Sequence, residues 1–80
     1  MGITSQLNRK YRSLIARGIY PVCHLCGKQI IHQNEVSQDH LICLSSSGPT
    51  IKENLCVAHK ICNNKRGNMT LQQWFDRQRN

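Results

Sequence analysis

Acidic and aromatic residues are scarce in this 80-residue sequence, and no long apolar run occurs in it. Four residues are acidic and eleven are basic, which gives a net charge of +7 with neutral histidines. Aromatic residues make up only 5% of the chain, and a chain of this length buries too little surface for a large core. These shortages exclude a large multidomain enzyme. They predict a single small domain, residues 1–80, that is held together by disulfides or by a metal.

The sequence also lacks the patterns of membrane and exported proteins. No window approaches the roughly 18 consecutive apolar residues that a membrane span requires, so we expect no membrane partner. The first residues do not show the basic and then apolar pattern of an export signal, so we expect a cytoplasmic protein. The excess of positive charge instead indicates a polyanionic partner, with nucleic acid favoured over anionic lipid.

Cysteine is abundant for a chain of this length. The five cysteines are an odd number, which favours a metal site over a disulfide framework when no export signal is present. Cys23 and Cys26 form one short-spaced pair between a proline and a glycine, and His59 and Cys62 form a second. A closed set of three thiolates and an imidazole is typical of structural, tetrahedral zinc. We therefore predict structural zinc at these four residues.

The remaining cysteines and two histidines receive a different interpretation. Cys43 and Cys56 lie in short apolar segments, and a free cysteine usually behaves as a small buried hydrophobic residue. We predict both as core or near-core thiols, with Cys56 as the main competitor for a zinc position. His24 lies between two zinc ligands but should face away from them, and His32 has no partner at metal-ligand spacing. We expect both histidines at the surface.

Apolar spacing and capping residues predict helices at both ends of the chain and short strands between them. A helix over 5–17 is predicted by an apolar face of period 3.6, with Ser5 as its cap and Gly18 beyond its end. After this helix we expect a knuckle with a short hairpin within 19–32, a strand or strand-like turn at 36–44, a loop at 45–50 and a strand at 55–58. A second helix is expected to run from His59 or Lys60 to Arg66, where Gly67 stops it. A last helix is expected to open with a capping box formed by Thr70 and Gln73. This is an α+β chain.

The two terminal helices have distinct faces. The first carries Leu7, Tyr11, Leu14 and Ile15 on its apolar face and Arg9, Lys10, Arg12 and Arg17 elsewhere. Those basic residues are either ordinary solvated charges or contacts to a DNA backbone, and the sequence leaves both readings open. The last helix presents Leu71, Trp74 and Phe75 on one face, and we expect Trp74 to anchor it on the core.

An ordered series of motifs resembles a known family. The motifs are Asp39-His40, Ser47-Gly48, Glu53-Asn54-Leu55, His59-Lys-Ile-Cys62-Asn63 and Lys65-Arg66-Gly67. In this order they resemble the HNH (ββα-metal, His-Me finger) endonucleases, and the preceding Cys-x2-Cys is similar to their zinc-stapled branch. The resemblance covers about residues 23–67. It implies a small zinc-stapled ββα-metal fold with flanking N- and C-terminal helices.

The resemblance also implies a chemistry, which is metal-dependent hydrolysis of phosphodiester bonds to give 5′-phosphate and 3′-hydroxyl ends. It assigns His40 as the general base, a role that suits a side chain able to exchange its proton near neutral pH. Asn54 would hold a loop and help to orient this base. Asp39 and Asn63 would bind a divalent catalytic metal, Mg²⁺ or Mn²⁺. Since neighbours on a regular strand face opposite ways, the motif is expected to bend so that Asp39 and His40 serve one site.

Several assignments within the motif remain open. Many members have histidine where this chain has Asn63, and a shift of one residue would give its role to Asn64. The second zinc pair is His59 and Cys62, where two cysteines are more common. The cations near the motif are candidate phosphate contacts or ordinary solvated charges: Lys52, Lys60, Lys65 and Arg66.

Three functional hypotheses follow. The favoured one is a DNA endonuclease or nickase that acts on double-stranded DNA. The second is a non-catalytic, zinc-stapled nucleic-acid-binding module, and the third is a protein–protein adaptor. The Asp39-His40 pair favours the first, because a binding module has no need of it. We expect no separate recognition domain, so a protein partner that supplies specificity is left open. Small free-standing members of the family are common in bacteriophages and their hosts. The resemblance therefore implies that the protein works in the cytoplasm of a bacterial or phage-infected cell.

Overall fold

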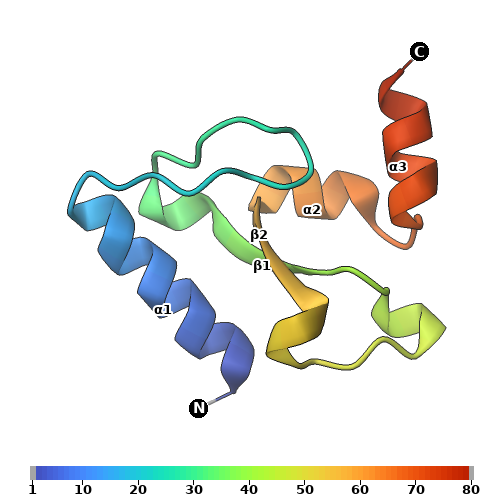
Figure 1. Ribbon diagram of the computed structural model, residues 1–80, viewed down its shortest axis with the longest axis horizontal. Helices are drawn as coiled ribbons and strands as arrows, with labels where there is room; N and C mark the ends of the chain where they lie inside the picture. Colours follow the sequence, from blue (N-terminus) through green and yellow to red (C-terminus); the bar gives the residue numbers. More distant parts are fainter. Residues whose placement is uncertain (1, 80) are drawn as a thin grey trace.

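A computed structural model describes residues 2–79 of the chain. Within this range three α-helices surround a two-stranded antiparallel sheet (Figure 1). In chain order the elements are α1 (Ile3–Ala16), η1 (Gln33–Glu35), β1 (Val36–His40), η2 (Leu44–Ser46), η3 (Lys52–Asn54), β2 (Leu55–His59), α2 (Lys60–Arg66) and α3 (Leu71–Gln78), where η marks a 3-10 helix. The predicted α+β class with helices at both ends is confirmed.

The first helix, α1, is placed as predicted but begins earlier. It starts at Ile3 after Gly2, whose lack of a side chain leaves the helix without a side-chain cap, so the predicted cap by Ser5 is wrong. Its end is as predicted. Gly18 adopts a left-handed φ of +79° and donates its amide to the carbonyl of Ile15 at 2.9 Å. Glycine accepts this conformation without steric cost, which directs the chain towards the knuckle.

The knuckle that follows α1 is mostly irregular. The hairpin predicted within 19–32 reduces to one isolated bridge between Val22 and Gln29. The amide of Cys23 donates to the carbonyl of Lys28 at 2.9 Å, which closes the turn between them. The turn, rather than a strand ladder, therefore holds the first two predicted zinc ligands near each other.

The sheet consists of β1 and β2, and α2 follows β2 without a loop. The register runs from the Val36–His59 pair to the His40–Leu55 pair. β1 ends at His40 and not at residue 44, because the residues that would pair with a longer strand form η3, and the amide of Ile42 donates to the side-chain oxygen of Asn54 at 2.9 Å. The predicted strand was too long for this reason. The ββα order of the motif is present, with the predicted bounds for α2 and a positive φ of 53° at Gly67.

The last helix, α3, is tied to the knuckle by a tryptophan. Thr70 and Gln73 form the predicted capping box, in which the side chain of each accepts a hydrogen bond from the backbone of the other. Trp74 is 5% exposed and donates its indole N–H to the carbonyl of Leu25 at 2.9 Å, so its predicted role as an anchor is confirmed. Phe75, which the sequence places on the apolar face of this helix, is 41% exposed.

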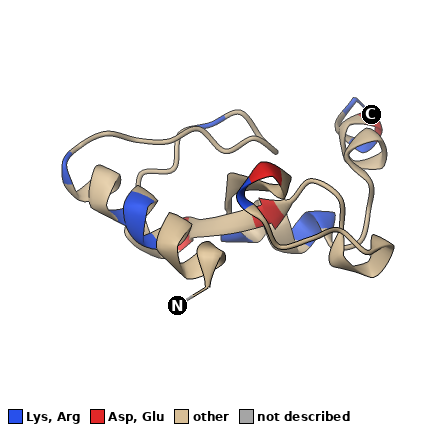
Figure 2. Ribbon diagram, turned by 60° about the horizontal axis from the view of Figure 1, so that its bottom comes forward, with Lys and Arg blue, Asp and Glu red and all other residues tan. Residues whose placement is uncertain are grey.

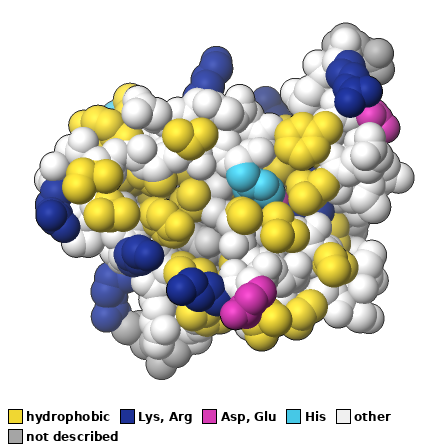
Figure 3. Space-filling model, viewed as in Figure 1, with side chains coloured by type: hydrophobic (Ala, Val, Ile, Leu, Met, Phe, Trp, Pro, Cys, Tyr) yellow, Lys and Arg dark blue, Asp and Glu magenta, His cyan; other side chains and the backbone are white. Residues whose placement is uncertain are grey.

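The core is small, as the composition indicates. Its buried members are Ile15, Cys23, Leu25, Ile30, Val36, Ala58 and Trp74. Large apolar side chains remain exposed on the segment between α1 and η1, where Figure 3 shows a broad hydrophobic area. They are Ile19, Tyr20, Val22 and Ile31. A core of this size leaves the knuckle dependent on another source of stability.

Positive charge is spread over the molecule. Figure 2 shows Lys and Arg along α1 and near the C-terminus, with few acidic residues between them. No helix within residues 2–79 has the length and the apolar character that crossing a bilayer demands. The basic residues of α1 that the sequence singled out, Arg9, Lys10 and Arg12, are exposed.

Candidate metal centre and adjacent cavity

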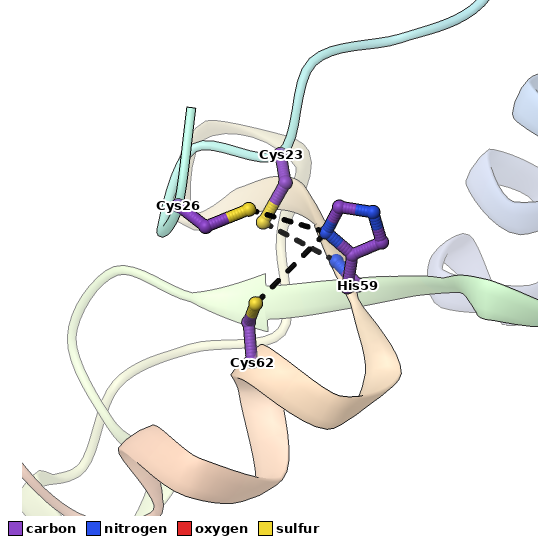
Figure 4. A group of neighbouring side chains, drawn as sticks. All are labelled: Cys23, Cys26, His59 and Cys62. Atoms are coloured by element: carbon purple, nitrogen blue, oxygen red, sulfur yellow. Dashed lines mark hydrogen bonds between the residues drawn. The ribbon is translucent and has the colours of Figure 1, made fainter. Parts of the chain in front are cut away.

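Four side chains, two from the knuckle and two from the junction of β2 with α2, meet beside the sheet (Figure 4). Cys23 and Cys26 come from the knuckle, His59 from the end of β2 and Cys62 from the first turn of α2. Their ligand atoms all lie within 4.8 Å of one another. Cys56, the competing thiol, lies outside this group. The predicted set is therefore brought together, and it can hold a structural metal such as zinc.

Electrostatics within the cluster favour a bound cation. Burial raises the pKa of the Cys23 thiol, but hydrogen bonds from backbone N–H groups, that of His59 first, outweigh it and lower this pKa from 9.0 to about 7. Burial and the neighbouring charge of Cys23 raise the pKa of Cys62 to about 12. One thiolate thus opposes ionisation of the next, and a divalent cation among them removes this conflict.

The imidazole of His59 lies between two thiols on one side and a carboxylate on the other. Its Nδ1 lies 3.4 Å from the sulfur of Cys26 and 3.9 Å from that of Cys62. Its Nε2 lies 3.4 Å from a carboxylate oxygen of Glu35, in η1. A carboxylate on the far nitrogen of a metal-binding histidine fixes its tautomer and orientation. Glu35 was missed in the sequence because it lies 24 residues before His59, with no motif joining them.

A second site, a small cavity that we call the second cavity, opens at the end of β1 remote from the metal cluster. It measures about 140 Å³ and is lined by Asp39, His40, Cys43, Leu44, Asn63, Gly67 and Asn68. The residues that the resemblance implies as metal ligands and general base, Asp39, Asn63 and His40, thus share one cavity. Asn64 is exposed on α2 and lies outside it. Asp39 and His40 remain paired in the regular ladder, so the predicted bend comes only after His40.

The carboxylate of Asp39 is held by two side chains. Asp39 is 4% exposed, and its Oδ2 accepts hydrogen bonds from Nη1 of Arg66 at 2.5 Å and from Nε2 of His24 at 2.8 Å. His24 was predicted at the surface, and that prediction is wrong, because its ring turns from the knuckle towards β1. Both hydrogen bonds fall on one oxygen, which leaves Oδ1 for a ligand in the cavity.

Arg66 was predicted to contact phosphate, and its burial contradicts this. Its side chain is 0% exposed. Besides Asp39, it donates to the carbonyls of His40 at 2.6 Å, Leu41 at 2.8 Å and Met69 at 2.9 Å, and its fifth N–H lies towards the sulfur of Cys43 at 3.4 Å. A guanidinium with its donors used in this way has none to offer to DNA. Arg66 instead joins the end of α2 to the end of β1. The other predicted cations, Lys52, Lys60 and Lys65, are exposed.

Asn54 acts on the loop that follows β1. Its amide donates to the carbonyls of Ile42 at 3.1 Å and Pro49 at 2.8 Å, and its oxygen accepts from the amide of Ile42 at 2.9 Å. Thr50, the residue after Pro49, has its hydroxyl 3.0 Å from Nε2 of His40. Asn54 therefore fixes the loop that presents Thr50 to the imidazole. Thr50 was missed because the contact depends on the path of the loop.

Asn63 is also oriented by β1. Its amide nitrogen donates to the hydroxyl of Ser37 at 3.3 Å and to the carbonyl of Gln38 at 3.1 Å. With the nitrogen occupied, the amide oxygen is the atom of this side chain that is available as a metal ligand.

Comparison with known families agrees with this geometry. A family model described as HNH endonuclease matches residues 23–69, which is more than half of the chain. The matched range contains all four residues of the metal centre and every residue that lines the second cavity. No curated protein matches the chain.

Proposed function

Because the chain belongs to the HNH endonuclease family, we propose that it is a metal-dependent DNA endonuclease or nickase. The observation that carries this proposal is that Asp39, His40 and Asn63 line one cavity. A carboxylate, an imidazole and an amide oxygen are together the groups that metal-assisted hydrolysis of a phosphodiester requires.

The residues of the second cavity fit a hard divalent cation in part. Oδ1 of Asp39 and the amide oxygen of Asn63 are oxygen ligands of the kind that Mg²⁺ and Mn²⁺ prefer, and two ligands leave positions for water and phosphate. When bound, such an ion supplies charge stabilisation to the phosphate and to the departing oxygen. Arg66 and His24 occupy Oδ2 of Asp39, which restricts this carboxylate to binding through a single oxygen.

His40 is the proposed general base. Its imidazole accepts a proton from water as the water oxygen bonds to phosphorus. The bond from phosphorus to the 3′ oxygen breaks, and this oxygen takes a proton from a solvent water. Thr50, 3.0 Å from Nε2, holds the ring in place, and Asn54 holds Thr50 through the loop. Asn54 is therefore a positioning residue in this mechanism. The products carry 5′-phosphate and 3′-hydroxyl ends.

The proposed substrate is double-stranded DNA. The net charge of +7 supports a polyanionic substrate, and Lys52, Lys60 and Lys65 are proposed to contact phosphates because they are exposed close to the motif. A substrate bound through such contacts loses affinity steeply as salt increases.

A supercoiled-plasmid assay tests the proposal. The zinc-loaded wild type is expected to nick or linearise the plasmid with Mg²⁺ or Mn²⁺, and His40→Ala is expected to lose this activity. His32→Ala is the matched control, since His32 is exposed and lies outside both sites. Cleavage by His40→Ala at the wild-type rate would refute the mechanism.

The pairing of Asp39 with Arg66 favours one alternative, a non-catalytic, zinc-stapled nucleic-acid-binding module. A carboxylate neutralised by a guanidinium is a weaker metal ligand. This alternative is supported if the wild type binds DNA in a salt-dependent manner but cleaves none with any divalent ion. The same assay therefore separates the two functions.

A further inference from the structure

The ring of His24 connects the two sites. His24 lies between Cys23 and Cys26, so its backbone is fixed by the zinc knuckle. Its Nε2 reaches Oδ2 of Asp39, 15 residues further along the chain, at 2.8 Å. The side chain of His24 is 20% exposed and that of Asp39 is 5% exposed. This contact joins the knuckle, which carries two of the metal-binding thiols, to the strand that carries Asp39.

We infer that His24 is a positioning residue that couples the zinc knuckle to the catalytic metal site by fixing the carboxylate of Asp39. This inference rests on the proposed function. The imidazole donates its Nε2 proton to the carboxylate, because a carboxylate can only accept. With Arg66 donating to the same oxygen, the torsion of the carboxylate is fixed from two directions.

The two donors are anchored differently. Arg66 belongs to α2 and also holds three carbonyls, so it is built into the fold. His24 has one side-chain partner in the described chain, Asp39, and its place depends on the knuckle. Removing the imidazole therefore frees one side of the carboxylate and leaves the frame intact. Groups that orient a metal ligand in this way typically contribute about 10–100-fold to metal affinity or activity.

The expected consequence is a change in the affinity for the catalytic ion and not in the affinity for zinc. The probe is Mn²⁺ added to the zinc-loaded full chain, with free Mn²⁺ measured by its paramagnetic resonance signal. Asp39→Asn identifies the site by abolishing Mn²⁺ binding. His24→Ala is expected to weaken Mn²⁺ binding about tenfold or more. His24→Gln, whose amide N–H can replace the Nε2 donor, is expected to recover most of the loss.

Four further readouts separate positioning from folding. In His24→Ala the zinc content and the fluorescence of Trp74, which packs on the knuckle, are expected to match the wild type. The Mn²⁺ concentration for half-maximal cleavage is expected to rise, while kcat at saturating Mn²⁺ stays near the wild-type value. His32→Ala is the control and should change none of these quantities.

Any of four results would overturn the inference. They are wild-type Mn²⁺ affinity in His24→Ala, loss of zinc together with loss of Mn²⁺ affinity in that variant, equal losses in His24→Gln and His24→Ala, and absence of Mn²⁺ binding to the wild type. Failure of the nuclease proposal is recognised separately, by a wild type that binds Mn²⁺ at Asp39 and cleaves no DNA. The Mn²⁺ affinities of the variants would still decide the role of His24.

Discussion

Glu35 shows how a single side chain can control the zinc centre from outside the ligand set. Its carboxylate lies 3.4 Å from Nε2 of His59, so it stabilises the tautomer that leaves Nδ1 for the metal. We predict that Glu35→Ala lowers zinc affinity about 10–100-fold, the usual cost of losing an outer-shell partner. Competition with a zinc chelator at fixed pH measures the change. Glu53→Ala, on an exposed residue of η3, is the control, and equal affinities in both variants would contradict the assigned role.

The thiols make zinc affinity dependent on pH. In the metal-free protein the pKa of Cys23 is about 7 and that of Cys62 is about 12. Between these values Cys62 still carries the proton that zinc must displace, and below pH 7 Cys23 carries one as well. Zinc affinity should therefore increase with pH, more steeply below pH 7 than above it. Zinc titrations from pH 6 to 8 measure this, and an affinity independent of pH would refute it.

At the scale of an element, the path of the loop between β1 and β2 requires a glycine at position 48. A methyl group at this position would overlap the carbonyl of Ile42, the oxygen that accepts from Asn54. We predict that Gly48→Ala moves the loop, releases Thr50 from His40 and lowers cleavage more than it lowers zinc binding. Gly2→Ala, at a glycine with no neighbour within 4 Å of the added carbon, is the matched control. Plasmid cleavage rates and zinc content together test this, and full activity of Gly48→Ala would contradict it.

The end of α2 is joined to β1 by Arg66. Arg66→Met removes the charged partner of a buried carboxylate and takes away the guanidinium donors to the carbonyls of His40, Leu41 and Met69. Breaking a buried ion pair in this way costs about 3–5 kcal/mol. Arg66→Lys should recover little of it, because an ammonium cannot reach the same set of acceptors. Urea denaturation of the zinc-loaded proteins measures the free energy of unfolding. If Arg66→Met lowers the free energy of unfolding by less than about 1 kcal/mol, the ion pair would be worth no more than a solvent-exposed one, which would contradict its role in joining α2 to β1.

At the scale of the whole molecule, we propose that folding depends on zinc bound by the four-residue cluster. Structural zinc sites in small domains contribute about 10–16 kcal/mol of apparent binding energy, which is comparable to the total stability of an ordinary domain of about 5–15 kcal/mol. We predict that Cys62→Ser or removal of zinc by a chelator unfolds the chain. Cys56→Ser, at a half-buried thiol outside the cluster, is the control and should stay folded. Circular dichroism and Trp74 fluorescence follow the change. A chelated protein that keeps its thermal transition would refute this prediction.

The sequence predicts those parts of the molecule that local patterns determine. Cys23 with Cys26 and His59 with Cys62 are each three residues apart, and a metal of fixed ligand chemistry joins the pairs regardless of the loop between them. The capping box of Thr70 and the left-handed glycine at the end of α1, Gly18, also involve only residues that are close in the sequence. These features could be read from the sequence before the fold was known.

The contacts that the sequence did not predict are set by packing between elements. Arg66 resembles a surface cation in a basic segment, and only the approach of α2 to β1 buries it against Asp39. His24 has an ordinary environment in the sequence, and its direction follows from the turn of the knuckle. Charge alone could not distinguish Arg66 from the exposed Lys65 beside it, because burial depends on the helix face.

The central claim is that one metal holds the scaffold while a second metal binds at Asp39 and Asn63 beside His40. Anomalous diffraction from crystals that contain both zinc and manganese tests it most directly. We predict zinc at Cys23, Cys26, His59 and Cys62, and manganese in the second cavity, bound by Oδ1 of Asp39 and the amide oxygen of Asn63. Manganese absent from that cavity, or zinc bound by a different set of residues, would contradict the claim.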